Sequence, residues 1–210
     1  MASDDLDLSA ILASRICHDI VGPVGAIGNG LELLAEEDDP EMRQQALDLL
    51  THSAEQAARR LTFYRLAFGA SGGANVPVSL IEARDAAARW LEGGRTALAW
   101  PDDAIQAEMN KPRLRLLLNL LLVAVDALPR GGEVAVAVAA DAARLEVVAA
   151  GTGAGVDGDL AAALDGCVDA GELTPKQLPA YLATRLAAAL GGQVEYAADG
   201  EKARFTASFS

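Results

Sequence analysis

Two long stretches of helical periodicity, separated by a short break, constrain this fold more than any other feature of the sequence. Apolar residues recur at alternating spacings of three and four in a predicted helix over about residues 6–37, and again in one over about 41–68. Asp38-Asp39-Pro40 lies between them, and proline is well suited to the first turn of a new helix. The pattern predicts two antiparallel helices joined as a hairpin.

In this pattern Cys17 takes the first position of a heptad, and one apolar seam joins the two helices. The seam leaves a second apolar flank, with Leu12, Ile16 and Val21, without a partner in the hairpin. A second copy of the hairpin would cover that flank. We therefore expect a homodimer in which two hairpins form a four-helix bundle.

The pattern changes after a run of small residues rich in glycine, which ends at Val76-Pro77. This run predicts a division into a hairpin domain over residues 1–70, a linker over 71–77 and a second domain over 78–210. In the second domain we expect helices over about 80–91, 112–128 and 174–190, and strands over about 96–100, 133–138, 144–148, 193–197 and 203–209. Helices segregated from a mixed sheet predict an α/β sandwich, so the whole chain is expected to be α+β.

Composition excludes several classes of function. The net charge of −13 argues against nucleic acid as a partner, because binding to phosphates needs a basic surface. The two cysteines, Cys17 and Cys167, have no metal-site or disulfide spacing. The most apolar segment, residues 114–128, is interrupted by polar residues and is shorter than the ~20 residues of a membrane span. The acidic start of the chain is unlike a signal peptide. We expect a cytoplasmic protein that holds no metal and contacts no membrane.

His18 is the residue best placed for chemistry. It lies beside the predicted seam, and Ser14, Gly22 and Gly25 share its face of the helix. An exposed neutral imidazole is a good nucleophile for phosphoryl transfer, which requires little more of an acceptor than alignment. A surface histidine on a helix weakened by glycine is the alternative. His52 is expected to lie in solvent, opposite the seam.

Two neighbours of His18 could support that chemistry. Asp19 could hold one ring nitrogen protonated, although adjacent helical side chains diverge. Arg15, one turn back, could offset the charge of a phosphohistidine or simply be solvated. Pro23 cannot donate a hydrogen bond to the carbonyl of Asp19, so we expect the helix to bend there.

The run from His18 to Pro23 resembles the H-box of histidine kinases, and the run from Leu117 to Gly132 resembles their N-box. Where the kinases have a second asparagine for Mg²⁺, this chain has Val123, which offers no oxygen. The segment 150–155 lacks the aspartate that reads adenine, and 174–181 lacks the glycines of the phosphate loop. The second domain therefore resembles an ATP-binding domain that has lost its nucleotide site.

In this combination the chain resembles the ChpT-type histidine phosphotransferases of bacterial phosphorelays. The resemblance implies that His18 accepts a phosphoryl group from the phospho-aspartate of a hybrid kinase's receiver domain and passes it to a response regulator. It implies no ATP and no cofactor in this chain, with Mg²⁺ held by the receiver. Asp19 and Arg15 would support the transfer. The expected docking residues are Ser14, Ile20, Val21, Gly22 and Gly25. An ATP-dependent histidine kinase and a non-catalytic dimeric scaffold are the alternatives.

Overall fold

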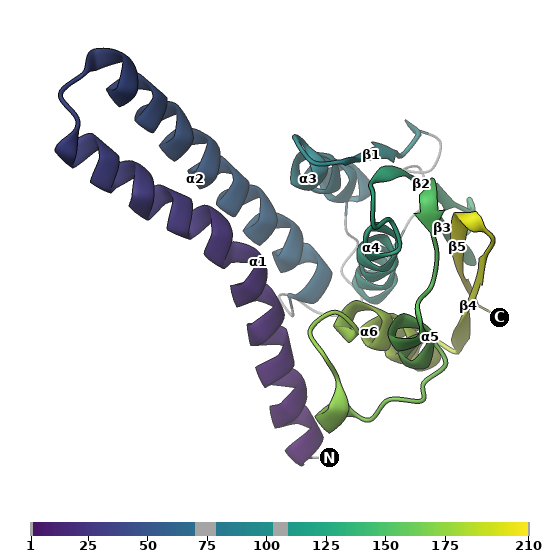
Figure 1. Cartoon of the computed structure of the whole chain (residues 1–210). Coiled ribbons are helices and arrows are strands. Elements are labelled where there is room, and N and C mark those ends of the chain that lie inside the picture. Colours follow the sequence, from purple (N-terminus) through teal and green to yellow (C-terminus); the bar gives the residue numbers. More distant parts are fainter. Residues whose placement is uncertain (1, 70–78, 103–108, 210) are drawn as a thin grey trace.

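The computed structural model describes residues 2–69, 79–102 and 109–209. It consists of a long helical hairpin and a C-terminal domain, the part from residue 79 onward, in which helices cover one side of a mixed sheet (Figure 1). The predicted α+β class is confirmed. The predicted linker, 71–77, lies outside the described residues, so the domain boundary stays a prediction.

The hairpin is built from α1 (Ala2–Glu36) and α2 (Pro40–Phe68). The carboxylate of Asp39 caps α2, accepting hydrogen bonds of 2.8 and 3.1 Å from two backbone amides of its first turn. Arg43 donates to two carbonyls at the end of α1, at 2.7 and 2.8 Å. Each helix end that meets the turn therefore has partners for part of its unpaired backbone.

Pro23 marks a bend in α1, which Figure 1 shows near the middle of the helix. Because proline has no N–H, the carbonyl of Asp19 loses its donor within the helix. The guanidinium of Arg60, from α2, donates to that carbonyl instead. Further along, a Cβ on Gly30 would lie 2.8 Å from the Leu50 side chain, so the absence of a side chain lets the two helices approach closely.

The heptad positions that were predicted to form one seam do not all face the same way. Some face the other helix of the hairpin, and others lie on its outer surface. Val24 and Leu31 on α1, and Leu47 and Leu61 on α2, are each about half exposed, so these heptad positions do not face the partner helix within the chain. The predicted uncovered flank is partly wrong. Val21 is exposed, but Leu12 and Ile16 pack against the hydrophobic core that α2 shares with the C-terminal domain.

The C-terminal domain contains a five-stranded sheet of order β1-β2-β3-β5-β4, in which β1 and β2 are parallel and the other pairs antiparallel. Its elements are α3 (Leu80–Leu91), β1 (Thr96–Ala99), α4 (Lys111–Asp126), β2 (Gly132–Val138), β3 (Arg144–Ala154), α5 (Gly158–Leu164), η2 (Ala170–Glu172), α6 (Leu178–Ala189), β4 (Gly192–Ala198) and β5 (Gly200–Phe209).

Several elements differ from the prediction. The sequence pattern missed the short helices α5 and η2, and β3 continues past the predicted end at 148. The last helix begins at Leu178 and not at Thr174. The side chain of Gln177 accepts hydrogen bonds from the backbone and the hydroxyl of Thr174, at 3.0 and 2.9 Å, and closes a separate turn before the helix.

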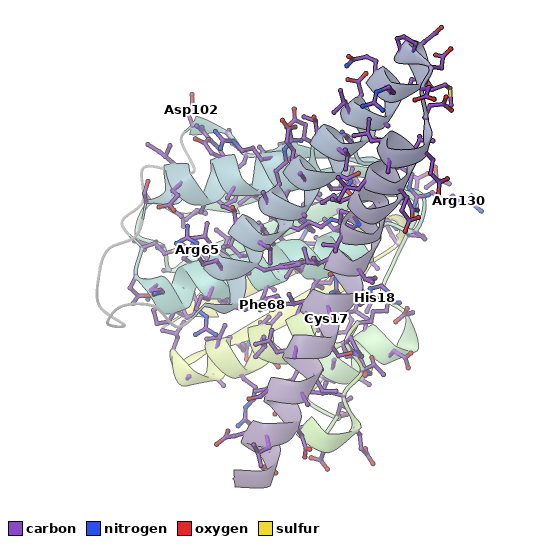
Figure 2. The ribbon with its side chains drawn as sticks, turned by 90° about the vertical axis from the view of Figure 1, so that its left-hand side faces the viewer. Cys17, His18, Arg65, Phe68, Asp102 and Arg130 are labelled. Carbon is purple, nitrogen blue, oxygen red and sulfur yellow. The ribbon has the colours of Figure 1, made fainter. Side chains whose placement is uncertain are left out.

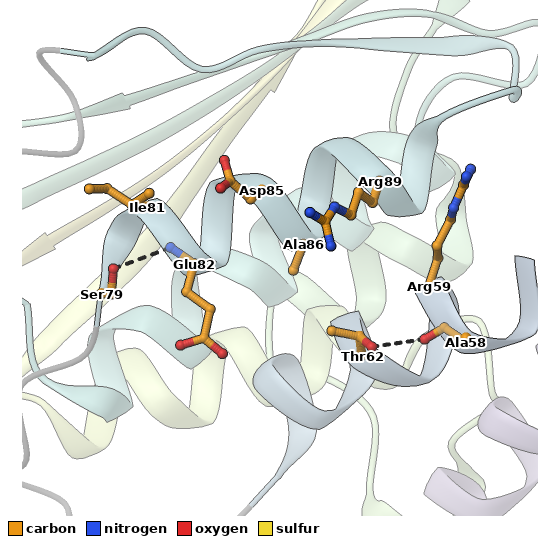
Figure 3. Close-up of a pocket in the computed structure, with 9 residues that line it drawn as sticks. All are labelled: Ala58, Arg59, Thr62, Ser79, Ile81, Glu82, Asp85, Ala86 and Arg89. Carbon is orange, nitrogen blue, oxygen red and sulfur yellow. Dashed lines mark hydrogen bonds between the residues drawn. The ribbon is translucent and has the colours of Figure 1, made fainter. Parts of the chain in front are cut away.

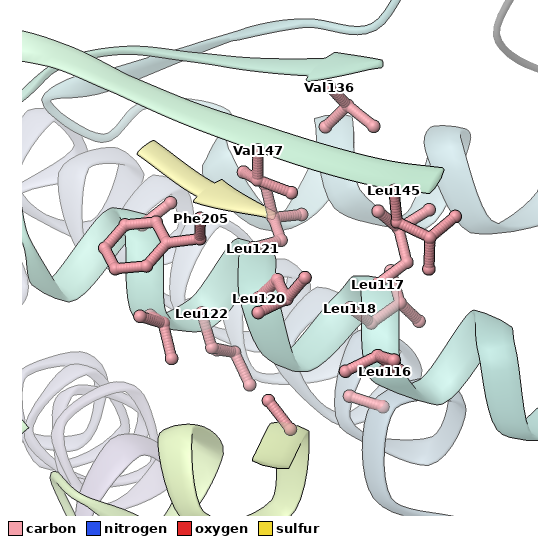
Figure 4. Close-up of a cluster of buried hydrophobic side chains, with 14 of the residues drawn as sticks. Leu116, Leu117, Leu118, Leu120, Leu121, Leu122, Val136, Leu145, Val147 and Phe205 are labelled. Carbon is pink, nitrogen blue, oxygen red and sulfur yellow. The ribbon is translucent and has the colours of Figure 1, made fainter. Parts of the chain in front are cut away.

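The core is centred on α4 (Figure 4). The sheet lies against one side of this helix, while α2 and α6 contact the rest of its surface. Its leucines are therefore buried around most of the helix rather than along a single stripe. The fully buried members that the figure labels on α4 are Leu116, Leu117, Leu118, Leu120, Leu121 and Leu122.

Candidate phosphoacceptor site

His18 lies midway along α1, beside Cys17 and at the level of the C-terminal domain (Figure 2). Its side chain is 81% exposed. Its Nδ1 is 2.9 Å from Oδ1 of Asp19. The expectation that adjacent helical residues would be poorly placed for such a contact is therefore wrong. With Nδ1 engaged by a carboxylate, the other ring nitrogen, Nε2, is left as the free one.

Asp19 is held by more groups than the sequence suggested. Its Oδ2 accepts from Nε of Arg15 at 3.0 Å and from the hydroxyl of Tyr64 on α2. Burial by itself would raise the pKa of this carboxyl, but the hydrogen bonds from Tyr64 and His18 and the charge of Arg15 outweigh it and lower the pKa. Asp19 is therefore a fixed carboxylate whose Oδ1 is directed at His18.

Arg15 is largely buried and engaged by protein groups, so the solvated alternative is wrong. Its side chain is 11% exposed and lies between the two parts of the protein. Besides Asp19, its guanidinium donates to Asp126 at the end of α4, at 3.2 Å, and to the backbone carbonyl of Pro175, at 3.3 Å. Arg15 therefore links the hairpin to the C-terminal domain, and its supporting role toward a phosphohistidine stays a prediction.

Asp126 is a site residue that the sequence analysis missed. Burial raises its pKa, and the charge of Arg15 offsets only part of that rise. With Arg15, His18, Asp19 and the turn at 174–176, it lines a cavity of about 460 Å³. The available signal was the only acid of this helix, placed at the end of its long apolar run, because a buried acid needs a cationic partner.

The face of α1 around His18 is open. Ser14, Val21, Gly22 and Gly25 are exposed, and no atom lies within 4 Å of a Cβ placed on either glycine. Ile20, the fifth expected docking residue, is half-buried. An α-helix turns about 100° per residue, so the His18 face and the exposed stripe through Val24 lie roughly 120° apart on α1. The two faces are therefore separate surfaces of α1.

In the region that resembles the kinase N-box, the side chains pack the core or link elements of the protein. Val123 is fully buried in the core. The Asn119 amide donates to the carbonyls of Ala67 on α2 and Arg115 on α4, at 3.1 and 2.7 Å, so it ties α4 to the hairpin. Among the described residues no group of three or more histidine, cysteine or acidic side chains is arranged to hold a metal ion.

A second cavity, of about 610 Å³, lies between α2 and α3 (Figure 3). Arg59 and Arg89 extend along it from opposite helices, and Ser79 and Thr62 use their hydroxyls in local hydrogen bonds. His18 is not among the residues that line it. This cavity adds nothing to the acceptor site.

One described helix, Asp4–Glu36 within α1, is long and apolar enough to cross a membrane by length and composition alone. Asp19 and Arg15 tie its middle to α2 and α4. An apolar helix of this length is equally typical of a bundle, so the finding is weak grounds for a membrane span.

The helical hairpin presents to solvent a histidine that is paired with an acid, and it is joined to an α/β domain. This arrangement is typical of phosphotransfer proteins. It is similar over 97% of its length to a solved bacterial phosphotransferase, with 33% identity, 96% coverage of that chain and a TM-score of 0.82. Residues 80–202 match the family model of the histidine phosphotransferase C-terminal domain. The chain belongs to the histidine phosphotransferase family.

The similarity to a curated relative covers part of each chain. Protein phosphotransferase ChpT of Brucella abortus (strain 2308) is 45% identical over 131 residues, which are 62% of this chain and 60% of that protein. The match therefore spans less than two thirds of the relative. The histidine kinase AdeS of Acinetobacter baumannii has 13% identity and a TM-score of 0.45 over 92% of this chain and 97% of that one.

Proposed function

We propose that this protein is an intermediary of a phosphorelay. His18 takes a phosphoryl group from the phospho-aspartate of one receiver domain, that of a hybrid kinase, and gives it to the aspartate of a response regulator. One observation carries the proposal: an exposed imidazole has a fixed carboxylate at Nδ1 and leaves Nε2 free. The family and the relative's name as a protein phosphotransferase support it.

The transfer balances without a proton leaving the ring. The Nε2 lone pair forms a bond to phosphorus while the phosphorus–oxygen bond to the receiver's aspartate breaks, and that aspartate leaves as a carboxylate. The ring keeps its proton on Nδ1 and becomes positively charged. Asp19, at 2.9 Å from Nδ1, offsets that charge. Return of the phosphoryl group to a second aspartate is the reverse step.

We propose that the chain itself uses no ATP and no metal ion, and that the receiver supplies Mg²⁺. Val123 has no oxygen for a cation and lies in the core. The turn at 174–177 contains no glycine, and Arg15 already uses its Pro175 carbonyl. These residues support a C-terminal domain that has a structural and docking role.

We propose also that the protein acts in the cytoplasm and binds neither membranes nor nucleic acid.

The receiver is proposed to dock on the open face around His18. The glycines at 22 and 25 leave room for a helix of the partner to approach. Thr174, Pro175 and Lys176 line the cavity beside His18, so the C-terminal domain adds a second wall to this surface. A receiver seated there would contact both parts of the protein.

A transfer assay tests this function. A receiver domain that carries labelled phospho-aspartate is expected to label the wild-type protein but not His18→Gln. His52→Gln should be labelled as well, because His52 does not line the cavity beside His18. Equal labelling of wild type and His18→Gln would sink the proposal. Labelling of the purified protein by ATP alone would favour a histidine kinase, and no labelling from any receiver of a panel would favour a scaffold.

We propose further that the protein is a homodimer with a four-helix bundle. The exposed heptad positions support this, because Val24 and Leu31 on α1 and Leu47 and Leu61 on α2 form two apolar stripes that a second hairpin would cover. Leu31→Glu is expected to halve the mass in sedimentation equilibrium, since a buried charge disrupts such an interface. Ile81→Glu, equally exposed on α3, is the matched control. An unchanged mass of Leu31→Glu, or a monomeric wild type, contradicts the dimer.

A further inference from the structure

Tyr64 of α2 contacts the acid that pairs with His18, although it does not touch His18. The residue is 4% exposed, and its ring packs between Phe63 and Phe68, with ring centroids 6.0 and 5.5 Å away. Its hydroxyl donates to Oδ2 of Asp19. A receiver docked on the outer face of α1 cannot reach a side chain that is buried to this degree.

The two oxygens of Asp19 have separate partners. Oδ2 receives Tyr64 and Arg15, whereas Oδ1 faces Nδ1 of His18. Tyr64 approaches from α2, and Arg15 from the preceding turn of α1. Donors from two directions restrict the rotation of the carboxylate, so its second oxygen stays directed at the ring.

The phenol is suited to act only as a donor. Burial and the hydrogen bond to Asp19 raise the pKa of Tyr64, so it stays protonated at neutral pH. A hydroxyl has one proton to donate, and here that proton is committed to Asp19. Adjacent residues of a helix point about 100° apart, and the donors on Oδ2 hold the carboxylate in the orientation in which Oδ1 meets His18.

We propose that Tyr64 is a positioning residue for phosphoryl transfer: through Asp19 it holds His18 with its proton on Nδ1 and its Nε2 lone pair directed at the incoming phosphorus. This rests on the proposed function of His18. Tyr64 touches neither the substrate nor the reacting atoms. Its contribution is the orientation and tautomer of the nucleophile, which do not depend on the identity of the receiver.

Tyr64→Phe tests the role because it removes only the hydroxyl and keeps the ring between Phe63 and Phe68. The ¹⁵N NMR signals of the His18 ring are expected to show the Nδ1–H tautomer in wild type and a mixture of tautomers in the variant. Transfer from a phosphorylated receiver is expected to slow about tenfold, the effect of losing one hydrogen bond to a charged group. Tyr196→Phe is the control, because it removes a hydrogen bond to Asp165 in the C-terminal domain.

The two readouts separate the possible failures. An Nε2–H tautomer in wild type overturns the inference without any variant, and so does a Tyr64→Phe spectrum identical to that of wild type. A changed tautomer with an unchanged transfer rate rejects the role in transfer. If His18→Gln still accepts label, the proposed function fails, whatever the tautomer is. A purely structural tyrosine would lower stability and leave the ring signals unchanged.

Discussion

Asp19→Ala is expected to slow phosphoryl transfer to His18 by about 100-fold, the lower end of what a positioned acid or base contributes. The substitution removes the carboxylate that lies 2.9 Å from Nδ1. The ring then distributes between two tautomers, one of which has its proton on the attacking nitrogen. The positive charge that develops on the ring also loses its counterion. The two losses together correspond to about 2.7 kcal/mol in the barrier.

Stopped-flow or rapid-quench transfer from a phosphorylated receiver measures this loss. Glu32→Ala is the control, because Glu32 is an exposed acid on the same helix. Asp19→Asn keeps an oxygen that could accept from Nδ1 but loses the charge, so an intermediate rate is expected. A transfer rate for Asp19→Ala within threefold of wild type would show that the carboxylate has no part in the chemistry. Loss of receiver binding in a titration would assign the effect to docking.

Arg15→Met is expected to cost about 3 kcal/mol of the free energy of unfolding, at the low end of the range for breaking a buried ion pair. The methionine fills similar space but leaves Asp126, whose side chain is 22% exposed, without its ion-pair partner, and only the weaker effect of the Lys176 charge remains. Asp19 loses one of its two Oδ2 donors at the same time. Urea unfolding at pH 7 measures the effect. Arg59→Met is the control, and its more exposed ion pairs are expected to contribute at most about 1 kcal/mol.

The stability lost in Arg15→Met should depend on pH, and the pKa of Asp126 sets the direction. Burial already raises the pKa of Asp126, and removing Arg15 raises it further. A group with a raised folded pKa stabilises the fold below its unfolded pKa, and that stability is lost as pH rises through the folded pKa. The deficit of Arg15→Met should therefore be largest near pH 7 and shrink toward pH 4. Arg15→Met/Asp126→Leu should recover most of the stability. A deficit that is constant with pH and unchanged in the double variant would show that Asp126 is not its cause.

Periodicity and turn residues were enough to predict most of the fold. The hairpin, its break at Pro40 and all five strands were found from local patterns, because each of those signals lies within one element. The helix α5 was missed, although Asp157 ahead of it accepts from the backbone N–H of Leu160 at 2.8 Å as a capping residue does. Its seven residues are too few to establish a helical period.

The candidate site was less accessible to sequence reasoning. His18 and Asp19 are adjacent in the chain, so their pattern could be recognised locally. Tyr64 fitted the apolar spacing of α2, and nothing in that spacing distinguishes a ring that fills a core from one whose hydroxyl reaches Asp19. Asp126 and Arg15 are 111 positions apart, and their pairing depends on how two domains meet. Likewise, a periodic row of apolar residues predicts that one face of a helix is buried, but it does not say against which element. The heptad pattern therefore could not tell contacts between α1 and α2 from the apolar positions that remain exposed.

The bend at Pro23 also affects the mechanics of the hairpin. Arg60 and Tyr64, one turn apart on α2, contact the backbone carbonyl and the carboxylate of the same residue, Asp19. A slide of α2 along α1 by one residue, about 1.5 Å, would break both contacts at once. These contacts fix the register of α1 and α2 at Asp19, the residue next to His18. The backbone and the acid beside His18 are therefore both tied to α2, so a shift between the two helices would be felt directly at the phosphoacceptor.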